Sequence, residues 1–439
     1  MRLVIKGGRI IDPRNGLDTV GDLLVEDGVI AWCGQHLPDA MALDGDVVFD
    51  ASGLIVAPGL IDMHVHLREP GFEYKETIES GGRAAAAGGF TAVVPMPNTN
   101  PATDNRAMVE FVARRARETS PVRVWPTVAA TRGNENELMS EIADAKEAGA
   151  VAVTDDAFPL QSAELTRRVM EYCATFDLPL LTHCEDKTMT RGGVMNEGLV
   201  STLMGLKGMP RAAEEIQVAR NIRLAELTGC RLHILHISTA RSIELVREAK
   251  KRGVSVTCET CPQYFTLTDE SALGYDTMVK CSPPVRTAED VDAVRAGLAD
   301  GTIDAIATDH APHAAHEKEC EFQAAAFGMV GLETALGLVL TRLVHAGVIG
   351  LADAIRKMTV APASILGIPG GHLSVQSPAD ITIIDPDERW TVDPEAFQSR
   401  SRNTPFAGWE LRGRAVATIV GGQIVHGDLV RAPRGRVRA

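Results

Sequence analysis

The amino-acid sequence predicts an α/β protein, a (β/α)₈ barrel of the TIM type with a small composite β-sandwich formed by both ends of the chain. The barrel is indicated by short apolar segments that alternate with amphipathic segments from residue 58 onward. Polar side chains at the ends of several of these apolar segments support it, because barrels collect functional groups there. The sandwich is indicated by short-strand patterns with glycine turns near both ends of the chain.

The alternating segments can be placed in order. Eight short strands are expected at 60–66, 91–96, 122–128, 151–154, 178–183, 232–237, 254–257 and 303–308. Amphipathic helices are expected at 107–117, 135–148, 212–227 and 243–250, followed by a last helical region at 331–348 and 352–358. The alternative is a doubly wound open sheet, and no G-x-G-x-x-G follows a strand to favour it.

The two ends of the chain have a different pattern. Short strands are expected at 3–5, 9–11, 23–25 and 47–49, and again at 379–385, 415–420 and 423–425. Neither group alone is large enough for a stable sheet with a buried face, so both are expected to pair into one unit. The predicted domains are therefore 1–57 with 365–439 as the composite β-sandwich, and 58–364 as the barrel that carries the catalytic site.

Composition excludes several classes of partner. The net charge of the 439 residues is −14, which argues against non-specific binding to nucleic acid or an anionic membrane. No signal peptide and no apolar run of about 18 residues is visible, and the eight cysteines lack a disulfide-framework spacing, so a cytoplasmic location is expected. The arginines at 431, 434, 436 and 438 are a local exception, expected as a frayed, solvated tail.

The stretch His64-Val65-His66 is the first candidate site. A strand has a side-chain period of two, so His64 and His66 point to the same side, and two imidazoles at a strand end can share a metal ion such as zinc. Other predicted strands also end in potential ligands. These are Asp155, Asp156, His183, His236 and Asp309. Ligands at the ends of five separate strands predict a metal site at the mouth of the barrel, whereas strand parity alone leaves open which of Asp155 and Asp156 takes part.

Parity also sorts the other histidines. His233 and His310 alternate away from His236 and Asp309, so both are expected to be structural, whereas His313 lies in the loop after the last strand, within reach of the mouth. Cys258-x-x-Cys261 has no second pair to complete a zinc site and is expected to be structural as well.

Several motifs resemble those of the dihydroorotases of the amidohydrolase superfamily. They are His64-Val65-His66-Leu67-Arg68-Glu69-Pro70-Gly71, Met96-Pro97-Asn98-Thr99-Asn100-Pro101, Thr154-Asp155-Asp156, His236-Ile237-Ser238 and Ala307-Thr308-Asp309-His310-Ala311-Pro312-His313. The resemblance covers nearly the whole chain. It implies metal-dependent interconversion of N-carbamoyl-L-aspartate and (S)-dihydroorotate in de novo pyrimidine synthesis, with a small molecule as substrate.

The resemblance also implies roles for the candidate ligands. His64, His66 and Asp309 would bind the more buried ion, and His183 and His236 the second, with one or two zinc ions per subunit. Many relatives bridge the ions with a carboxylated lysine, but the fourth strand here ends in aspartates, and the branch that uses Asp directly matches Asp156. Two metal ions polarise an amide carbonyl and lower the pKa of a shared water. Asp309 would take the proton of the attacking group and deliver it to the leaving nitrogen.

The anionic substrate requires donors at the mouth. Arg68 offers a fork that matches a carboxylate, with Asn98 and His313 as neighbouring donors. One position departs from the family, since Ser282 stands where asparagine usually contacts the pyrimidine ring. This departure leaves a hydantoinase- or allantoinase-type ring as an alternative substrate.

The non-enzymatic alternative is a catalytically weak homologue that scaffolds aspartate transcarbamoylase, and loss of ligands would be its signature. A homodimer, associating with aspartate transcarbamoylase or acting alone, is expected.

Overall fold

Strands from both ends of the chain form one sheet. The computed structural model describes residues 2–427, so the arginines between 431 and 438 lie outside the described residues. The sheet has the strand order β19-β18-β17-β5-β1-β2-β3, and β4 pairs with β1 off this path. Its strands are β1 (Arg2–Asp12), β2 (Leu17–Glu26), β3 (Val29–Gly34), β4 (Val47–Asp50), β5 (Ile55–Pro58), β17 (Ile381–Thr391), β18 (Glu410–Val420) and β19 (Gln423–Gly427).

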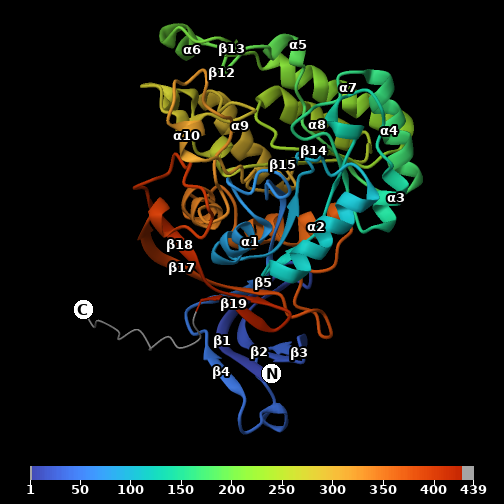
Figure 1. Ribbon diagram of the computed structural model, residues 1–439. Helices are drawn as coiled ribbons and strands as arrows, with labels where there is room; N and C mark the ends of the chain where they lie inside the picture. The colour runs from blue at the N-terminus through green and yellow to red at the C-terminus, as the bar shows by residue number, and fades with distance from the viewer. Residues whose placement is uncertain (1, 428–439) are drawn as a thin grey trace.

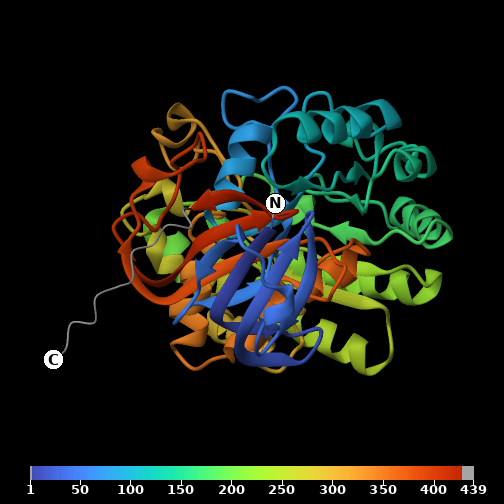
Figure 2. The same cartoon turned by 90° about the horizontal axis from the view of Figure 1, so that it is seen from below.

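The two ends meet where β5 pairs antiparallel with β17, from Ile55 opposite Ile384 to Pro58 opposite Ile381. Viewed from below, the red strands of the C-terminal end lie beside the blue strands of the N-terminal end (Figure 2). Apolar side chains from both ends, including Leu3, Ile10, Ile381 and Ile419, form one buried cluster. The pairing of the two ends that the sequence predicts is therefore present, while the division at 57/58 and 364/365 stays a prediction.

Between the two ends, strands and helices alternate, and all the strand pairs are parallel (Figure 1). One sheet has the order β6-β7-β8 and a second β16-β15-β14-β11-β10-β9, and in a third β12 (Met195–Asn196) pairs with β13 (Gly208–Met209). The strands are β6 (Leu60–Val65), β7 (Phe90–Pro95), β8 (Arg123–Val124), β9 (Val128–Ala129), β10 (Val153–Thr154), β11 (Leu180–Thr182), β14 (Leu232–Ile234), β15 (Val256–Thr260) and β16 (Ala305–Ile306). An isolated parallel bridge joins Val65 to His310, next to the ends of β6 and β16.

Helices connect these strands. The longer ones are α1 (Ile78–Ala87), α2 (Arg106–Thr119), α4 (Ala163–Thr175), α7 (Ala212–Thr228), α8 (Ala240–Lys251), α9 (Ala288–Ala299) and α12 (Leu351–Met358). Several begin at a capping side chain, because the hydroxyl or amide oxygen accepts a hydrogen bond from a backbone N–H of the first turn. The caps are Thr77 of α1, Asn105 of α2, Ser162 of α4 and Thr239 of α8.

Shorter elements complete the chain. They are α3 (Ile142–Glu147), α5 (Lys187–Thr190), β12 (Met195–Asn196), α6 (Leu199–Met204), β13 (Gly208–Met209), α10 (Ala315–Lys318), α11 (Ala335–Val339) and α13 (Val360–Leu366). Within the described residues, no helix combines the length and the apolar character that a membrane crossing requires.

Several expected elements differ from the structure. The helix expected at 135–148 is confined to α3, because Asn134 and Asn136 have φ values of +59° and +62°, which a right-handed helix does not accept. The strand expected at 122–128 is two short strands, β8 and β9, that belong to different sheets. In the region 331–348, α11 continues into a π-helical turn at Leu340–Val344.

Candidate metal centre

The six residues predicted as metal ligands lie on or just after five parallel strands. His64 is the fifth residue of β6 and His66 follows that strand, while the others follow β10, β11, β14 and β16. Carboxyl ends of parallel strands meet at one edge of a sheet, which is why side chains so far apart in the sequence converge. All six are buried, with exposed fractions between 0 and 7%. They are His64, His66, Asp156, His183, His236 and Asp309.

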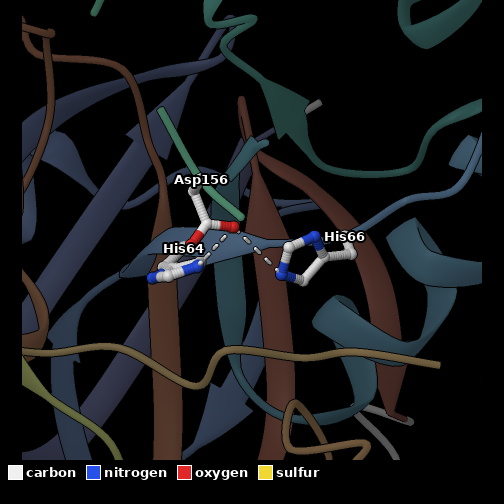
Figure 3. A group of neighbouring side chains, drawn as sticks. All are labelled: His64, His66 and Asp156. Carbon is white, nitrogen blue, oxygen red and sulfur yellow. Dashed lines mark ion pairs between the residues drawn. The ribbon is translucent and has the colours of Figure 1, made fainter. Parts of the chain in front are cut away.

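Asp156 lies at the centre of this group. One carboxylate oxygen, Oδ2, is 3.5 Å from His64 Nε2 and 3.6 Å from His66 Nε2 (Figure 3). The other oxygen, Oδ1, is 3.4 Å from His183 Nδ1 and 3.5 Å from His236 Nε2. The carboxylate therefore belongs to two triads of potential ligands, each with ligand atoms within 4.8 Å of one another.

The outer nitrogens of three imidazoles already have acceptors. His64 Nδ1 is 2.7 Å from Glu259 Oε1, His66 Nδ1 is 3.0 Å from Asn98 Oδ1, and His183 Nε2 is 2.9 Å from Glu185 Oε2. A metal-binding histidine almost always donates its other N–H in this way, which fixes the tautomer and turns the bare nitrogen to the ion.

Two atoms at the centre have no hydrogen-bond partner among the described residues. They are His64 Nε2 and Asp156 Oδ2, both buried, and an unpaired buried polar atom costs free energy. A divalent cation between them would satisfy both, and imidazole with carboxylate is a donor set that suits zinc and similar ions. The residues present therefore fit a metal centre.

Asp155 has a different environment from Asp156. Its carboxylate accepts hydrogen bonds from the backbone N–H groups of His183 and Leu160, both at 2.8 Å. Burial raises the pKa of Asp155 to about 6. The Asp155 side chain thus holds the segment that presents His183, whereas Asp156 contacts the imidazoles themselves. These contacts distinguish the two neighbouring aspartates, which strand parity could not.

Asp309 approaches the first pair of histidines. Its Oδ1 is 3.1 Å from His66 Nε2 and 3.5 Å from His64 Nε2. The backbone φ of Asp309 is +51°, and those of His236 and Arg68 are +31° and +61°. Side chains other than glycine rarely adopt this region, so three residues of the site carry local backbone strain that the surrounding packing has to hold.

The charged side chains of the site shift one another's pKa values. Burial disfavours a charged His64, but the carboxylates of Asp156 and Asp309 outweigh it and hold the pKa of His64 well above its usual value. For His183, hydrogen bonds to Asp156 and Glu185 overcome burial and raise the pKa to about 9. His64 and His183 in turn hold the pKa of Asp156 well below its usual value against the effect of burial. A bound cation would replace the protons on these imidazoles.

A cavity opens beside the ligands. Its empty volume is about 480 Å³, including open solvent, and its walls include His66, Asp156 and Asp309. The four residues predicted to bind substrate line the same cavity. They are Arg68, Asn98, Ser282 and His313. Phe327 and Gly328 form part of the wall as well, and sequence reasoning missed both, because the loop that carries them has no pattern typical of a site.

Arg68 and His313 lie close together in this cavity. Arg68 Nε donates to the backbone oxygen of Pro312 at 3.2 Å, and burial lowers the pKa of Arg68 to about 10, which leaves it charged at neutral pH. His313 Nε2 is 2.8 Å from the backbone oxygen of Phe327. Burial, together with Arg68 and Lys75, lowers the pKa of His313 to about 3. The imidazole is thus neutral, and its one N–H is directed to Phe327 and not to the cavity.

Two glutamates of the site were also missed by sequence reasoning. Glu185 is buried and accepts hydrogen bonds from His183 and from Lys187 Nζ at 2.6 Å, and its Oε2 is 3.5 Å from Ser282 Oγ. Glu259 is the fourth of the five residues of β15 and contacts both His64 and His233. The position of Glu185 two residues after His183 was the available signal, whereas no local pattern marks Glu259. His233 and His310 contact Thr257 and Glu76.

Comparisons of the sequence identify similar proteins. A family profile described as "Dihydro-orotase-like" matches residues 53–242. A dihydroorotase from Pelotomaculum thermopropionicum is 56% identical over 430 residues, with 98% of this chain and 100% of the relative covered. A dihydroorotase from Syntrophotalea carbinolica is 52% identical over 426 residues, with 97% and 99% covered.

Solved structures of similar fold are hydantoinases and dihydropyrimidinases. The L-hydantoinase (dihydropyrimidinase) from Arthrobacter aurescens superposes with a TM-score of 0.87 at 28% identity, covering 97% of this chain and 96% of that chain. The dihydropyrimidinase from Brevibacillus agri NCHU1002 has a TM-score of 0.84 at 22% identity, with 98% and 96% covered, and at this identity the likeness concerns the fold. With its full-length relatives above half identity, the chain belongs to the dihydroorotase family, as the resemblance of its motifs predicted.

Proposed function

We propose that this chain is a metal-dependent dihydroorotase that interconverts N-carbamoyl-L-aspartate and (S)-dihydroorotate in pyrimidine synthesis. The observation that carries the proposal is one cavity in which Arg68 and Asn98 face the candidate ligands His66, Asp156 and Asp309. A guanidinium fork suits the carboxylate of dihydroorotate, and the ligands suit hydrolysis of the adjacent cyclic amide. The names of the relatives support the same activity.

The scaffold proposed for this activity is a closed (β/α)₈ barrel with a composite β-sandwich. Two observations support closure of the two parallel sheets into a barrel. On one side, the parallel bridge from Val65 to His310 joins the residues next to β6 and β16. On the other side, β8 and β9, which belong to different sheets, follow each other directly in the chain. The proposed domains are 58–364 for the barrel and 1–57 with 365–439 for the sandwich.

The metal proposed is zinc, one or two ions per subunit. His64, His66 and Asp309 would hold one ion, His183 and His236 the other, and Asp156 would bridge them. When bound, such ions polarise a carbonyl oxygen and lower the pKa of water toward 7.

The side chains of the cavity have separate tasks in this reaction. Arg68 binds the substrate carboxylate and thereby orients the ring. Asn98 accepts a hydrogen bond from His66 through Oδ1, which leaves its NH₂ group to donate to the substrate. Asp309, which lines the cavity, takes the proton released in hydrolysis and returns it to the leaving nitrogen.

A second candidate function is hydrolysis of a related ring of the hydantoin or allantoin type. The specific observation that favours it is Ser282, which lines the cavity where the family usually has asparagine. A scaffold without activity is less well supported, since all six candidate ligands are present and converge. We extend the proposal to a cytoplasmic homodimer, which acts alone or associates with aspartate transcarbamoylase.

The decisive experiment is a hydrolysis assay on purified protein of measured metal content. Dihydroorotate, dihydrouracil, hydantoin and allantoin are compared at equal concentrations, and the reverse reaction is followed with N-carbamoyl-L-aspartate. Turnover that is highest with dihydroorotate and lost on chelation supports the proposal. Preference for another ring, or full activity without metal, contradicts it.

A further inference from the structure

Two lysines are buried beside the candidate active site. Lys280 and Lys318 have exposed fractions of 2% and 1%, which is unusual for this residue type. Within the described residues, neither ammonium forms an ion pair with a carboxylate within 4.0 Å. Burial lowers the pKa of each to about 8. A buried charge is costly unless hydrogen bonds compensate it, so their partners explain why they are tolerated.

Main-chain oxygens saturate both ammonium groups. Lys280 Nζ donates to the carbonyls of Phe322, Gln323 and Ala325, at 2.7, 3.0 and 2.6 Å. Lys318 Nζ donates to those of Ala326 and Gly328, both at 2.9 Å, and to Lys280 O at 3.3 Å. An ammonium has three N–H groups, so every donor is used.

Apart from Lys280 O, these carbonyls belong to one irregular segment, residues 322–328. It forms neither helix nor strand, so it cannot pair these carbonyls within itself, and the lysines replace a hydrogen-bond ladder. The Lys280 ammonium also lies 4.4 Å from the centre of the Phe327 ring, a cation–π distance.

The same contacts join two parts of the cavity wall. Gly328 N donates to Lys280 O at 2.9 Å, which ties the segment to the stretch that carries Ser282 two residues later. Ser282, Phe327 and Gly328 all line the cavity that holds Arg68 and Asp309. The two ammonium groups therefore contribute to the position of this wall relative to the candidate ligands, together with Asn403, whose Nδ2 also donates to Gly328 O at 3.1 Å.

We propose that Lys280 and Lys318 are positioning residues, which hold the wall formed by Ser282, Phe327 and Gly328 in the arrangement that binds substrate. The inference rests on the proposed function for the identity of the substrate, but the held wall is a property of the chain itself. Methionine in place of either lysine keeps most of the packing volume and removes all three donors. Because misplacement of a binding wall by about 1 Å is costly, KM should rise about tenfold or more, with a smaller change in kcat and an unchanged metal content.

The test combines kinetics with hydrogen exchange. Lys280→Met and Lys318→Met are assayed for KM and kcat with dihydroorotate, and amide exchange is followed in 322–328. Lys357→Met is the matched control, because Lys357 is also buried and donates to a backbone carbonyl, that of Ile303. Ile303 lies just before β16, at the opposite end of that strand from Asp309. We expect faster exchange and raised KM only in the first two variants.

Amide hydrogen exchange measured in the native protein keeps the inference testable even if a variant does not fold. The amides of Ala326 and Gly328 donate to Glu317 O and Lys280 O and should be protected without substrate. Exchange of these amides at the rate of an unstructured chain overturns the inference, as does a KM within about twofold of native in both folded variants. If the native protein is inactive on dihydroorotate, the proposed function is refuted instead. The amide exchange rates then decide whether the two lysines hold the wall.

Discussion

The Nδ1 atom of His64 lies 2.7 Å from a carboxylate oxygen of Glu259, and both side chains are fully inaccessible to solvent. The second oxygen of Glu259 is 3.3 Å from His233 Nε2. One carboxylate thus joins a candidate metal ligand to a histidine outside the metal site, and hydrogen bonds to both imidazoles lower the pKa of Glu259 to about 2 against the effect of burial.

Glu259→Gln should weaken metal binding. The amide cannot hold the His64 N–H as firmly as a carboxylate, so Nε2 loses its fixed orientation, and loss of such a partner costs about 10- to 100-fold in metal affinity or activity. Competition with a chromogenic chelator measures the affinity. Glu333→Gln serves as control and should leave the affinity unchanged, because the Glu333 carboxylate accepts from the backbone N–H groups of Gln398 and Ser399.

Asp156 and Asp155 should respond differently to asparagine. Asp156→Asn removes the shared ligand and should lower metal stoichiometry, whereas Asp155→Asn removes one of two acceptors for backbone N–H groups and should cost about 1–3 kcal/mol of unfolding free energy. Metal analysis and thermal melts separate the two. Added bicarbonate should change neither result, because a carboxylate needs no CO₂ to become a ligand; bicarbonate-dependent occupancy would show that the bridge is assigned wrongly.

Arg68→Lys should impair substrate binding and leave the metal in place. The ammonium keeps the charge but loses the fork, and a charge-assisted hydrogen bond is worth about 1.5–3 kcal/mol, so kcat/KM should fall about 10- to 100-fold. The measurement is steady-state kinetics with dihydroorotate beside metal analysis. Normal turnover by Arg68→Ala would refute this reading of the substrate.

Ser282→Asn tests ring specificity. If the native substrate is dihydroorotate, restoring the usual asparagine should leave turnover similar or better, because the amide adds a donor and an acceptor to the cavity wall. If another ring is native, the same change should harm that substrate while dihydroorotate remains poor. We expect the first outcome in a competition assay with the four cyclic amides.

The pKa of His183, about 9 in the metal-free protein, has a defined consequence for stability. It exceeds the usual value of 6.5, so the protonated form is favoured by folding. Its contribution is fully present below pH 6.5 and is lost as pH rises through 9. Metal binding must displace this proton, so metal affinity should rise with pH across the same window. Melts and metal titrations of chelated protein from pH 6 to about 9.5 measure both, and His183→Gln should flatten both curves.

Local rules were sufficient where the site follows strand geometry. The period of two placed His64 and His66 on one side, and their ring centres are 5.5 Å apart. Parity failed at Asp155 and Asp156 because β10 ends at Thr154, after which the chain no longer alternates. Glu259 could not be found from its neighbours, since its partner His64 is 195 residues away. The N–H of His313 is likewise directed by Phe327, which only the folded loop brings near.

The pairing of β5 with β17 has a consequence for synthesis on the ribosome. Ile381, the first residue of β17, follows Pro58, the last residue of β5, by 323 residues. At about 5–20 residues per second, translation of that interval takes roughly 16–65 s. During this time β5 has been made but one of its two neighbours does not exist, and an unpaired strand edge is open to wrong partners. The nascent chain thus has to protect its first strands until its last ones emerge.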